Sequence, residues 1–110
     1  ACVKVRLKPG ALPRVWEWAA QLNRRRDEVN ATLRDEGVML ESVFLDQTDH
    51  GDFLIYFMKA HSLDEAARVA QQSQHEIDHF HEDFKRETWE SRTSLTPLIE
   101  FSHPDIANPS

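Results

Sequence analysis

Cysteine is almost absent from this chain of 110 residues, because Cys2 is the only one. A lone cysteine excludes an intrachain disulfide and a cysteine-based zinc cluster, and it fits a reducing compartment. Long apolar runs are absent too, since none approaches the roughly 18 residues of a membrane span. The first residues do not resemble a signal peptide. The sequence therefore predicts a cytoplasmic protein without a membrane partner.

Familiar catalytic motifs are also missing. The chain has three glycines and contains no Gly-rich phosphate loop, nucleophile elbow or Cys–His pair. His75 and His79 have the spacing of a metal pair, but they are expected on an exposed helix face without a third ligand. We therefore predict no metal site and no resident cofactor. Any chemistry would depend on acid/base or electrostatic groups.

Positive charge is scarce. Lys and Arg total 13 against 19 Asp and Glu, which gives a formal net charge of -6. Such a chain repels a phosphate backbone unless its basic residues gather on one face. The one basic cluster, Arg24-Arg25-Arg26, is consecutive and is therefore spread around a helix. Nucleic acid is not an expected partner.

Periodicity and turn signals predict one α+β domain over residues 1–102, followed by a frayed tail over residues 103–110. One long helix is expected from Leu12 to Glu36, between Pro13 and Gly37. A second helical region is expected to be split in two, with starts at the capping-box sequences at Ser62 and Ser73 and an end near Glu87. The predicted strands are Cys2–Leu7, Val38–Leu45, Phe53–Met58 and Leu98–Phe101, with a hairpin loop over 46–52 and a loosely structured 91–94.

This order is the β-α-β-β-α-β arrangement of ferredoxin-like domains with a four-stranded antiparallel sheet. The strand Phe53–Met58 is apolar on both faces, and Val38–Leu45 is nearly so, although two helices cover only one face of such a sheet. The other face then suits a second copy of the chain. We predict a homodimer of the dimeric α/β-barrel type that associates through the sheet.

Arg26 is the most conspicuous polar residue of the long helix. At about 100° per residue it falls on the predicted core face, flanked by Asn23 and Asn30, and Trp16 lies at the edge of that face. An arginine there needs a partner or a ligand. One interpretation is a pocket in which these residues bind a polar or anionic molecule. The other is an internal ion pair with Glu41, Asp46 or Asp78, or a helix end that lifts off the sheet and lets Arg26 reach solvent. Trp18 is expected to be exposed on the opposite side of the helix.

His81 is the second candidate site residue. It is predicted among Ile77, Phe80 and Phe84, where restricted solvent favours a titration near neutrality and an acid/base role. Tyr56 and Arg26 are expected to converge on the same space, and Asp78 to steer the imidazole. The alternative is a histidine satisfied within the core.

Four segments together resemble a bacterial family of small proteins known only as a domain of unknown function. They are LKPG, WxxxLNxRRDEVxxTLxxEGV, ESVFLD and HEIDxxHxxF before Trp89. The resemblance implies a ferredoxin-like fold of the dimeric α/β-barrel type and no particular activity. More distantly, such barrels include cofactor-independent monooxygenases, isomerases, mutarotases and haem-handling enzymes, which is an analogy of fold alone.

Two functions therefore remain open. In the first, a homodimer binds a small polar or anionic molecule between the long helix and the sheet. His81, Arg26 and Asp78 act as catalytic groups and Asn23, Asn30, Tyr56 and Trp16 as ligand contacts, in chemistry of the isomerase or cofactor-free monooxygenase kind. In the second, the chain is a dimerisation or protein-interaction module without a small-molecule site.

Overall fold

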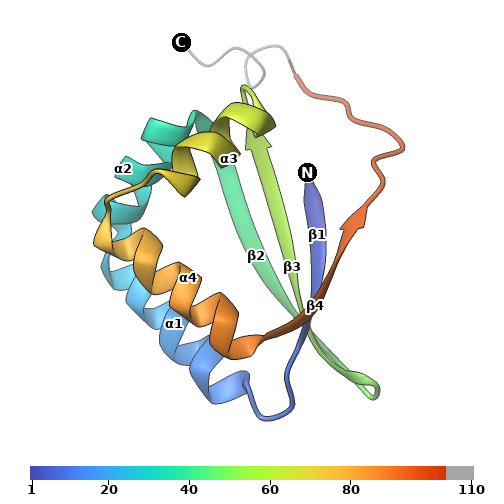
Figure 1. Ribbon diagram of the computed structural model, residues 1–110. Coiled ribbons are helices and arrows are strands. Elements are labelled where there is room, and N and C mark those ends of the chain that lie inside the picture. The colour runs from blue at the N-terminus through green and yellow to red at the C-terminus, as the bar shows by residue number, and fades with distance from the viewer. Residues whose placement is uncertain (104–110) are drawn as a thin grey trace.

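The computed structural model describes residues 1–103, and within them the predicted order of strands and helices is present. Four helices cover one face of a four-stranded antiparallel sheet of order β2-β3-β1-β4, which leaves the other face open (Figure 1). The α+β ferredoxin-like fold is thus confirmed. The elements are β1 (Cys2–Leu7), α1 (Leu12–Arg24), α2 (Arg26–Glu36), β2 (Val38–Thr48), β3 (Gly51–Ala60), α3 (Leu63–Gln71), α4 (Glu76–Thr88) and β4 (Trp89–Leu95).

The register of the sheet determines which side chains face the helices. Tyr56 pairs with Val3 on β1 and with Val43 on β2, and Leu54 pairs with Val5. Because side chains alternate along a strand, these residues all lie on the helix side. The neighbouring positions, which include Phe44 paired with Ile55, lie on the open face.

The core lies between the sheet and the helices α1 and α4. Phe84 of α4 is fully buried, and its ring stacks on that of Trp18 of α1 with centroids 4.3 Å apart. The other buried members of this cluster are Val5, Leu7, Ala11, Val15 and Leu54. The two helices therefore hold each other in place over the middle of the sheet.

The prediction of one continuous helix from Leu12 to Glu36 is wrong. The helix breaks at Arg25, whose φ of -106° and ψ of 38° are not helical. No glycine or proline marks the break, and tertiary packing accounts for it, because α1 packs on α4 whereas α2 packs on α3 and β2. The half-buried Arg25 bonds to Glu28 at 2.5 Å and approaches Glu76 of α4 at 3.9 Å.

The break also changes which residues face the core. Arg26, which a continuous helix would turn inward, is exposed. The two neighbouring tryptophans are placed opposite to the prediction, since Trp16 is 60% exposed and Trp18 only 4%. The core face of α1 is centred on Val15 and Trp18 because the large indole of Trp18 fills the space above Phe84.

The last strand is also displaced from its predicted position. The strand β4 follows α4 directly at Trp89, whereas residues 98–101 form no regular element and are exposed. Residues 91–94 therefore belong to the sheet, although their polar character suggested a loop. The hairpin between β2 and β3 is tighter than expected, because Thr48 pairs with Gly51 across a turn at residues 49–50.

The capping predictions hold at one of the two sites. The Ser62 hydroxyl accepts a hydrogen bond from the Glu65 amide at 3.2 Å and caps α3. Ser73 instead accepts from the His75 amide and donates to Asp78, so that α4 begins at Glu76. The predicted fraying from residue 103 onward falls almost wholly outside the described range. No helix in residues 1–103 is long and apolar enough to cross a membrane.

Candidate functional site

A cavity of about 790 Å³ lies between the helices and the sheet. We call it the central cavity. Its apolar wall comes from all the layers, with Leu22 of α1, Val29 and Leu33 of α2, and Ile77 of α4 facing Met58 of β3. Its polar wall carries titratable or hydrogen-bonding groups, namely Glu36, Glu41, Tyr56, Ser73, Asp78, His79, His81, Glu82, Lys85, Trp89 and Arg92.

Three rings of the polar wall lie close together. The Tyr56 ring is 6.2 Å from that of His81 and 5.3 Å from that of Trp89, centroid to centroid. The Tyr56 hydroxyl oxygen and the Trp89 indole nitrogen are both buried, and neither forms a hydrogen bond of standard geometry within residues 1–103; the Trp89 N–H nevertheless lies near enough to the Tyr56 oxygen to oppose the rise in the pKa of Tyr56 that burial causes. A buried donor without a partner costs about 1–3 kcal/mol. The hydrogen-bonding capacity of these two groups is therefore not fully used within the fold.

His81 is held in this group by the core of the protein. Its Nδ1 accepts a hydrogen bond of 3.1 Å from the indole nitrogen of Trp18. Burial, and next the positive charge of Lys85, lower the pKa of His81 to about 4. The imidazole is therefore neutral at physiological pH, and it does not titrate near neutrality as its sequence context suggested.

Carboxyl groups form the other part of the polar wall. Glu41 lies on the helix side of β2, and burial raises its pKa, with a further increase from Asp78. Burial together with Asp78, Glu41 and Asp35 raises the pKa of Glu36 to about 7. Neither Glu36 nor Glu41 forms a hydrogen bond or ion pair within the described part of the chain. Their protons are therefore held more tightly than those of ordinary carboxyl groups.

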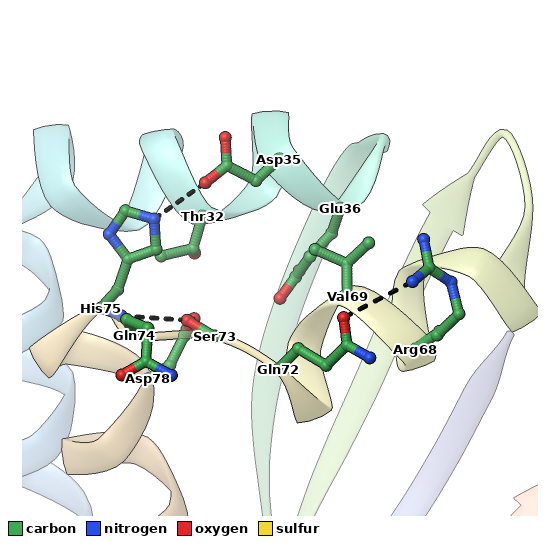
Figure 2. A pocket seen from close by; sticks show the side chains of 10 residues that line it. All are labelled: Thr32, Asp35, Glu36, Arg68, Val69, Gln72, Ser73, Gln74, His75 and Asp78. Carbon is green, nitrogen blue, oxygen red and sulfur yellow. Dashed lines mark hydrogen bonds and ion pairs between the residues drawn. The ribbon is translucent and has the colours of Figure 1, made fainter.

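A second, smaller pocket of about 270 Å³ adjoins this carboxyl wall (Figure 2). It shares Thr32, Glu36, Ser73 and Asp78 with the central cavity. An ion pair of 2.8 Å between His75 Nε2 and an Asp35 oxygen spans it from α4 to α2. Figure 2 shows Glu36 directed between α2 and α3, beside Val69.

The structure brings only some of the predicted site residues together. His81, Tyr56 and Asp78 all line the central cavity. Asp78 lies one helical turn before His81 and accepts a hydrogen bond from Ser73. No hydrogen bond or ion pair joins Asp78 to His81. Whether these three residues act on a ligand stays a prediction.

The remaining predicted site residues lie elsewhere. The group formed by Arg26, Asn23, Asn30 and Trp16 is exposed and does not line the central cavity. The break at Arg25 turns Arg26 outward, where it lies 3.5 Å from the Asn23 side-chain oxygen. The cationic side chains that line this cavity are Lys85 and Arg92 instead.

Sequence reasoning did not identify Glu36, Glu41 and Trp89 as site residues. Glu41 was considered only as an ion-pair partner for Arg26, although a single carboxylate between Leu40 and Val43 in an otherwise apolar strand was a usable signal. Trp89 directly follows a helix, and its place at the start of β4 requires knowledge of the fold. Glu36 could be recognised as a cavity residue only after the structure showed that α2 is a separate helix.

Replacing Glu36 with glutamine is expected to stabilise the protein at pH 8 and to have almost no effect at pH 4. Because the pKa of Glu36 is raised to about 7 in the fold, stability is present at low pH and is lost as the pH rises from about 4.5 to about 7. Because Glu36 remains partly exposed, solvent screens part of this effect. The stabilisation expected for Glu36→Gln at pH 8 is therefore about 1 kcal/mol. Thermal unfolding at the two pH values measures this difference.

The exposed Asp49 in the β2–β3 turn provides the control for that experiment. Asp49→Asn removes a carboxylate of the same charge from a site outside both pockets, and its effect should be small at either pH. An equal stabilisation by Glu36→Gln at pH 4 and pH 8 would contradict the assignment.

A metal site is not evident in the described part of the chain. Residues 1–103 contain no group of three or more His, Cys, Asp or Glu side chains arranged to hold an ion. His75, one member of the possible metal pair, bonds instead to Asp35.

Comparison with known proteins gives a family and a fold. A family model described as "Family of unknown function (DUF6176)" matches residues 1–106. None of the curated proteins matches the chain significantly. Among solved structures, the chain is similar to a putative antibiotic biosynthesis monooxygenase from Nitrosomonas europaea. The TM-score is 0.53 at 17% sequence identity, over 84% of this chain and 87% of that one. At this identity the likeness concerns the fold alone.

Proposed function

Because the chain belongs to this family of unknown function, we propose its function from the central cavity. The protein binds a small, neutral, polar molecule there and transfers a proton to or from it. The buried and unpaired Tyr56 hydroxyl and Trp89 indole N–H are the observation that supports this proposal most strongly. A protein that had no ligand would gain stability from phenylalanine at position 56, where only the hydroxyl group would be lost.

Glu41 is the group that we propose to carry the proton. It lies on the same face of the sheet as Tyr56 and diagonally across from it, because Tyr56 pairs with Val43 and Met58 pairs with Glu41. Diagonal neighbours of this kind are about 7–8 Å apart, which leaves room for part of a ligand between them. A raised pKa brings a carboxyl group closer to neutral pH, where the group can both accept a proton and return it.

The ligand is proposed to be neutral because the four carboxyl groups of the cavity wall, Glu36, Glu41, Asp78 and Glu82, outnumber its two side-chain cations, Lys85 and Arg92. Lys85 pairs with Glu82 at 3.0 Å and also lies over the Trp89 ring, and Arg26 is outside the cavity. An anion would meet Glu36, Glu41 and Asp78 on the same wall. Reactions compatible with this site are isomerisation and, with dioxygen as co-substrate, the oxygenation suggested by the name of the structurally similar protein.

Removal of either unpaired donor is expected to weaken ligand binding about tenfold without destabilising the free protein. A thermal-shift screen of small neutral polar compounds would identify ligands of the wild type, and Kd would then be measured for Tyr56→Phe and Trp89→Phe. Tyr56→Phe should leave the free protein equally stable, or stabilise it by up to about 1 kcal/mol, because the hydroxyl has no partner to lose.

Trp16→Phe is the matched control, since Trp16 is exposed on α1 and does not line the cavity. Its Kd should equal that of the wild type. The proposal would be abandoned if no compound stabilised the wild type, or if all three variants bound the ligand equally.

We also propose that the chain forms a homodimer through the open face of the sheet. The observation that favours this is a set of large apolar side chains left exposed there, namely Leu40, Phe44, Phe57 and Leu95. An apolar patch on a protein surface commonly marks an interface. Dimerisation would leave the central cavity on the outer side of each sheet, accessible to a ligand.

A further inference from the structure

The hydrogen bond between Trp18 and His81 determines where His81 carries its proton. An indole N–H is always a donor and never an acceptor. The Trp18 indole nitrogen lies 3.1 Å from His81 Nδ1, so Nδ1 is the acceptor and bears no proton. A neutral imidazole with a free Nδ1 carries its proton on Nε2.

The environment of Trp18 makes this arrangement rigid. Its side chain is 4% exposed and stacks on Phe84 with an angle of 6° between the ring planes. The His81 ring is itself nearly parallel to Trp18, at 26° and a centroid distance of 5.6 Å. Protonation of His81 at Nδ1 would replace the hydrogen bond by a contact between two donors, which agrees with the depressed pKa of this histidine.

His81 Nε2–H then joins two other donors at the cavity wall. Within the described residues, His81 Nε2 and the Tyr56 hydroxyl have no acceptor, and the Trp89 indole N–H lies near the Tyr56 oxygen without forming a hydrogen bond of standard geometry. Their rings are adjacent, as the centroid distances of 6.2 Å and 5.3 Å from Tyr56 show. A carbonyl oxygen has two lone pairs and an enolate oxygen has three, so three neighbouring donors suit an oxygen that gains negative charge during a reaction.

We infer that Trp18 is a positioning residue that keeps His81 as a hydrogen-bond donor, and that the ligand presents a carbonyl oxygen to His81, Tyr56 and Trp89. This inference rests on the proposed function of the central cavity and names its substrate class. It assigns His81 an electrophilic role in place of the acid/base role expected from the sequence.

A carbonyl compound also fits the carboxyl group on the opposite side. Glu41 removes a proton from the carbon next to the carbonyl, and the electron pair of the broken C–H bond moves to the oxygen as an enolate. The negative charge then develops where the three donors are placed, which is the arrangement that lowers such a barrier most. Where the substrate is a β,γ-unsaturated carbonyl compound, the enolate is a dienolate, and return of the proton from Glu41 to its γ carbon completes an isomerisation without any other reactant.

The tautomer can be measured directly in the wild-type protein. Long-range ¹H–¹⁵N correlation spectra at pH 7 should show His81 with the proton on Nε2 and a bare Nδ1, whereas the exposed His50 should show a mixture of tautomers. In Trp18→Phe, Nδ1 loses its donor, so both tautomers should be populated and the pKa of His81 should rise. A proton on Nδ1 of wild-type His81 overturns the inference, even if Trp18→Phe fails to fold.

The substrate class is tested with 1-indanone and indane, which differ only in the carbonyl group. We expect the wild type to bind 1-indanone at least tenfold more tightly than indane, as two or three hydrogen bonds would give. Trp18→Phe should bind 1-indanone about threefold more weakly than the wild type does, and it should bind indane as tightly as the wild type does.

These outcomes separate the inference from the proposed function. Equal affinity of the wild type for both compounds would overturn the carbonyl assignment while leaving a ligand-binding cavity intact. If neither compound bound and the wider screen also found no ligand, the proposed function itself would fail.

Discussion

Phe84→Ala is expected to lower the free energy of unfolding by about 3–5 kcal/mol, the largest stability effect that we predict for a single substitution. Phe84 is 0% exposed, and its ring stacks on Trp18 and lies near His81, with centroid distances of 4.3 Å and 6.2 Å. A domain of this size is usually stable by only about 5–15 kcal/mol. The variant would therefore retain little stability at 37 °C. Urea unfolding followed by tryptophan fluorescence measures the loss.

Phe101→Ala is the control for this experiment, because Phe101 is 89% exposed beyond β4. We expect it to change the free energy of unfolding by less than about 0.5 kcal/mol. A loss below about 1 kcal/mol in Phe84→Ala would mean that the stacked layer of α1 and α4 is not the centre of the core.

Phe44→Glu is expected to dissociate the proposed dimer into monomers. Phe44 is 61% exposed on the open face of the sheet, on the edge strand β2, where it pairs with Ile55 of β3. A buried Phe contributes about 1.5–3 kcal/mol, and a two-fold dimer carries the substitution twice. The dimer Kd should therefore rise by a factor of roughly 10²–10⁴. Size-exclusion chromatography with light scattering at micromolar protein gives the mass directly.

Trp16→Glu is the matched control for the dimer experiment. Trp16 is a large apolar residue that is equally exposed, at 60%, but it lies on α1 on the other side of the molecule. This variant should keep the mass of the dimer. A monomeric wild type at micromolar concentration would refute the dimer outright.

Most of the fold could be predicted from the sequence because the sequence patterns that specify its elements are local. Alternation in Cys2–Leu7, the apolar β3 and the capping serine at Ser62 each specify an element without reference to distant residues. The break at Arg25 was not accessible, because it carries no helix-breaking residue and results from the different packing partners of α1 and α2. The strand β4 was missed because its sequence WESRTSL is mostly polar.

The candidate site was only partly accessible for the same reason. His81 was correctly predicted among Phe80 and Phe84, since three residues on one turn of a helix share their surroundings. The prediction that Arg26 faces the core was wrong because it assumed one unbroken helix. The helix α1 ends after thirteen residues, at Arg24, and Arg26 belongs to the next helix. Glu41 and Trp89 enter the cavity from two strands, so only the sheet topology brings them near His81.

The central claim is that the donors of the cavity bind the oxygen of a small molecule. Its most direct test is a titration of ¹⁵N-labelled protein with 1-indanone, in which the indole N–H resonances of the three tryptophans are followed. We predict that the Trp89 resonance moves downfield as its N–H gains an acceptor, while that of the exposed Trp16 stays in place. A Trp89 resonance that does not move at saturating 1-indanone, or one that moves no more than Trp16, would contradict the claim.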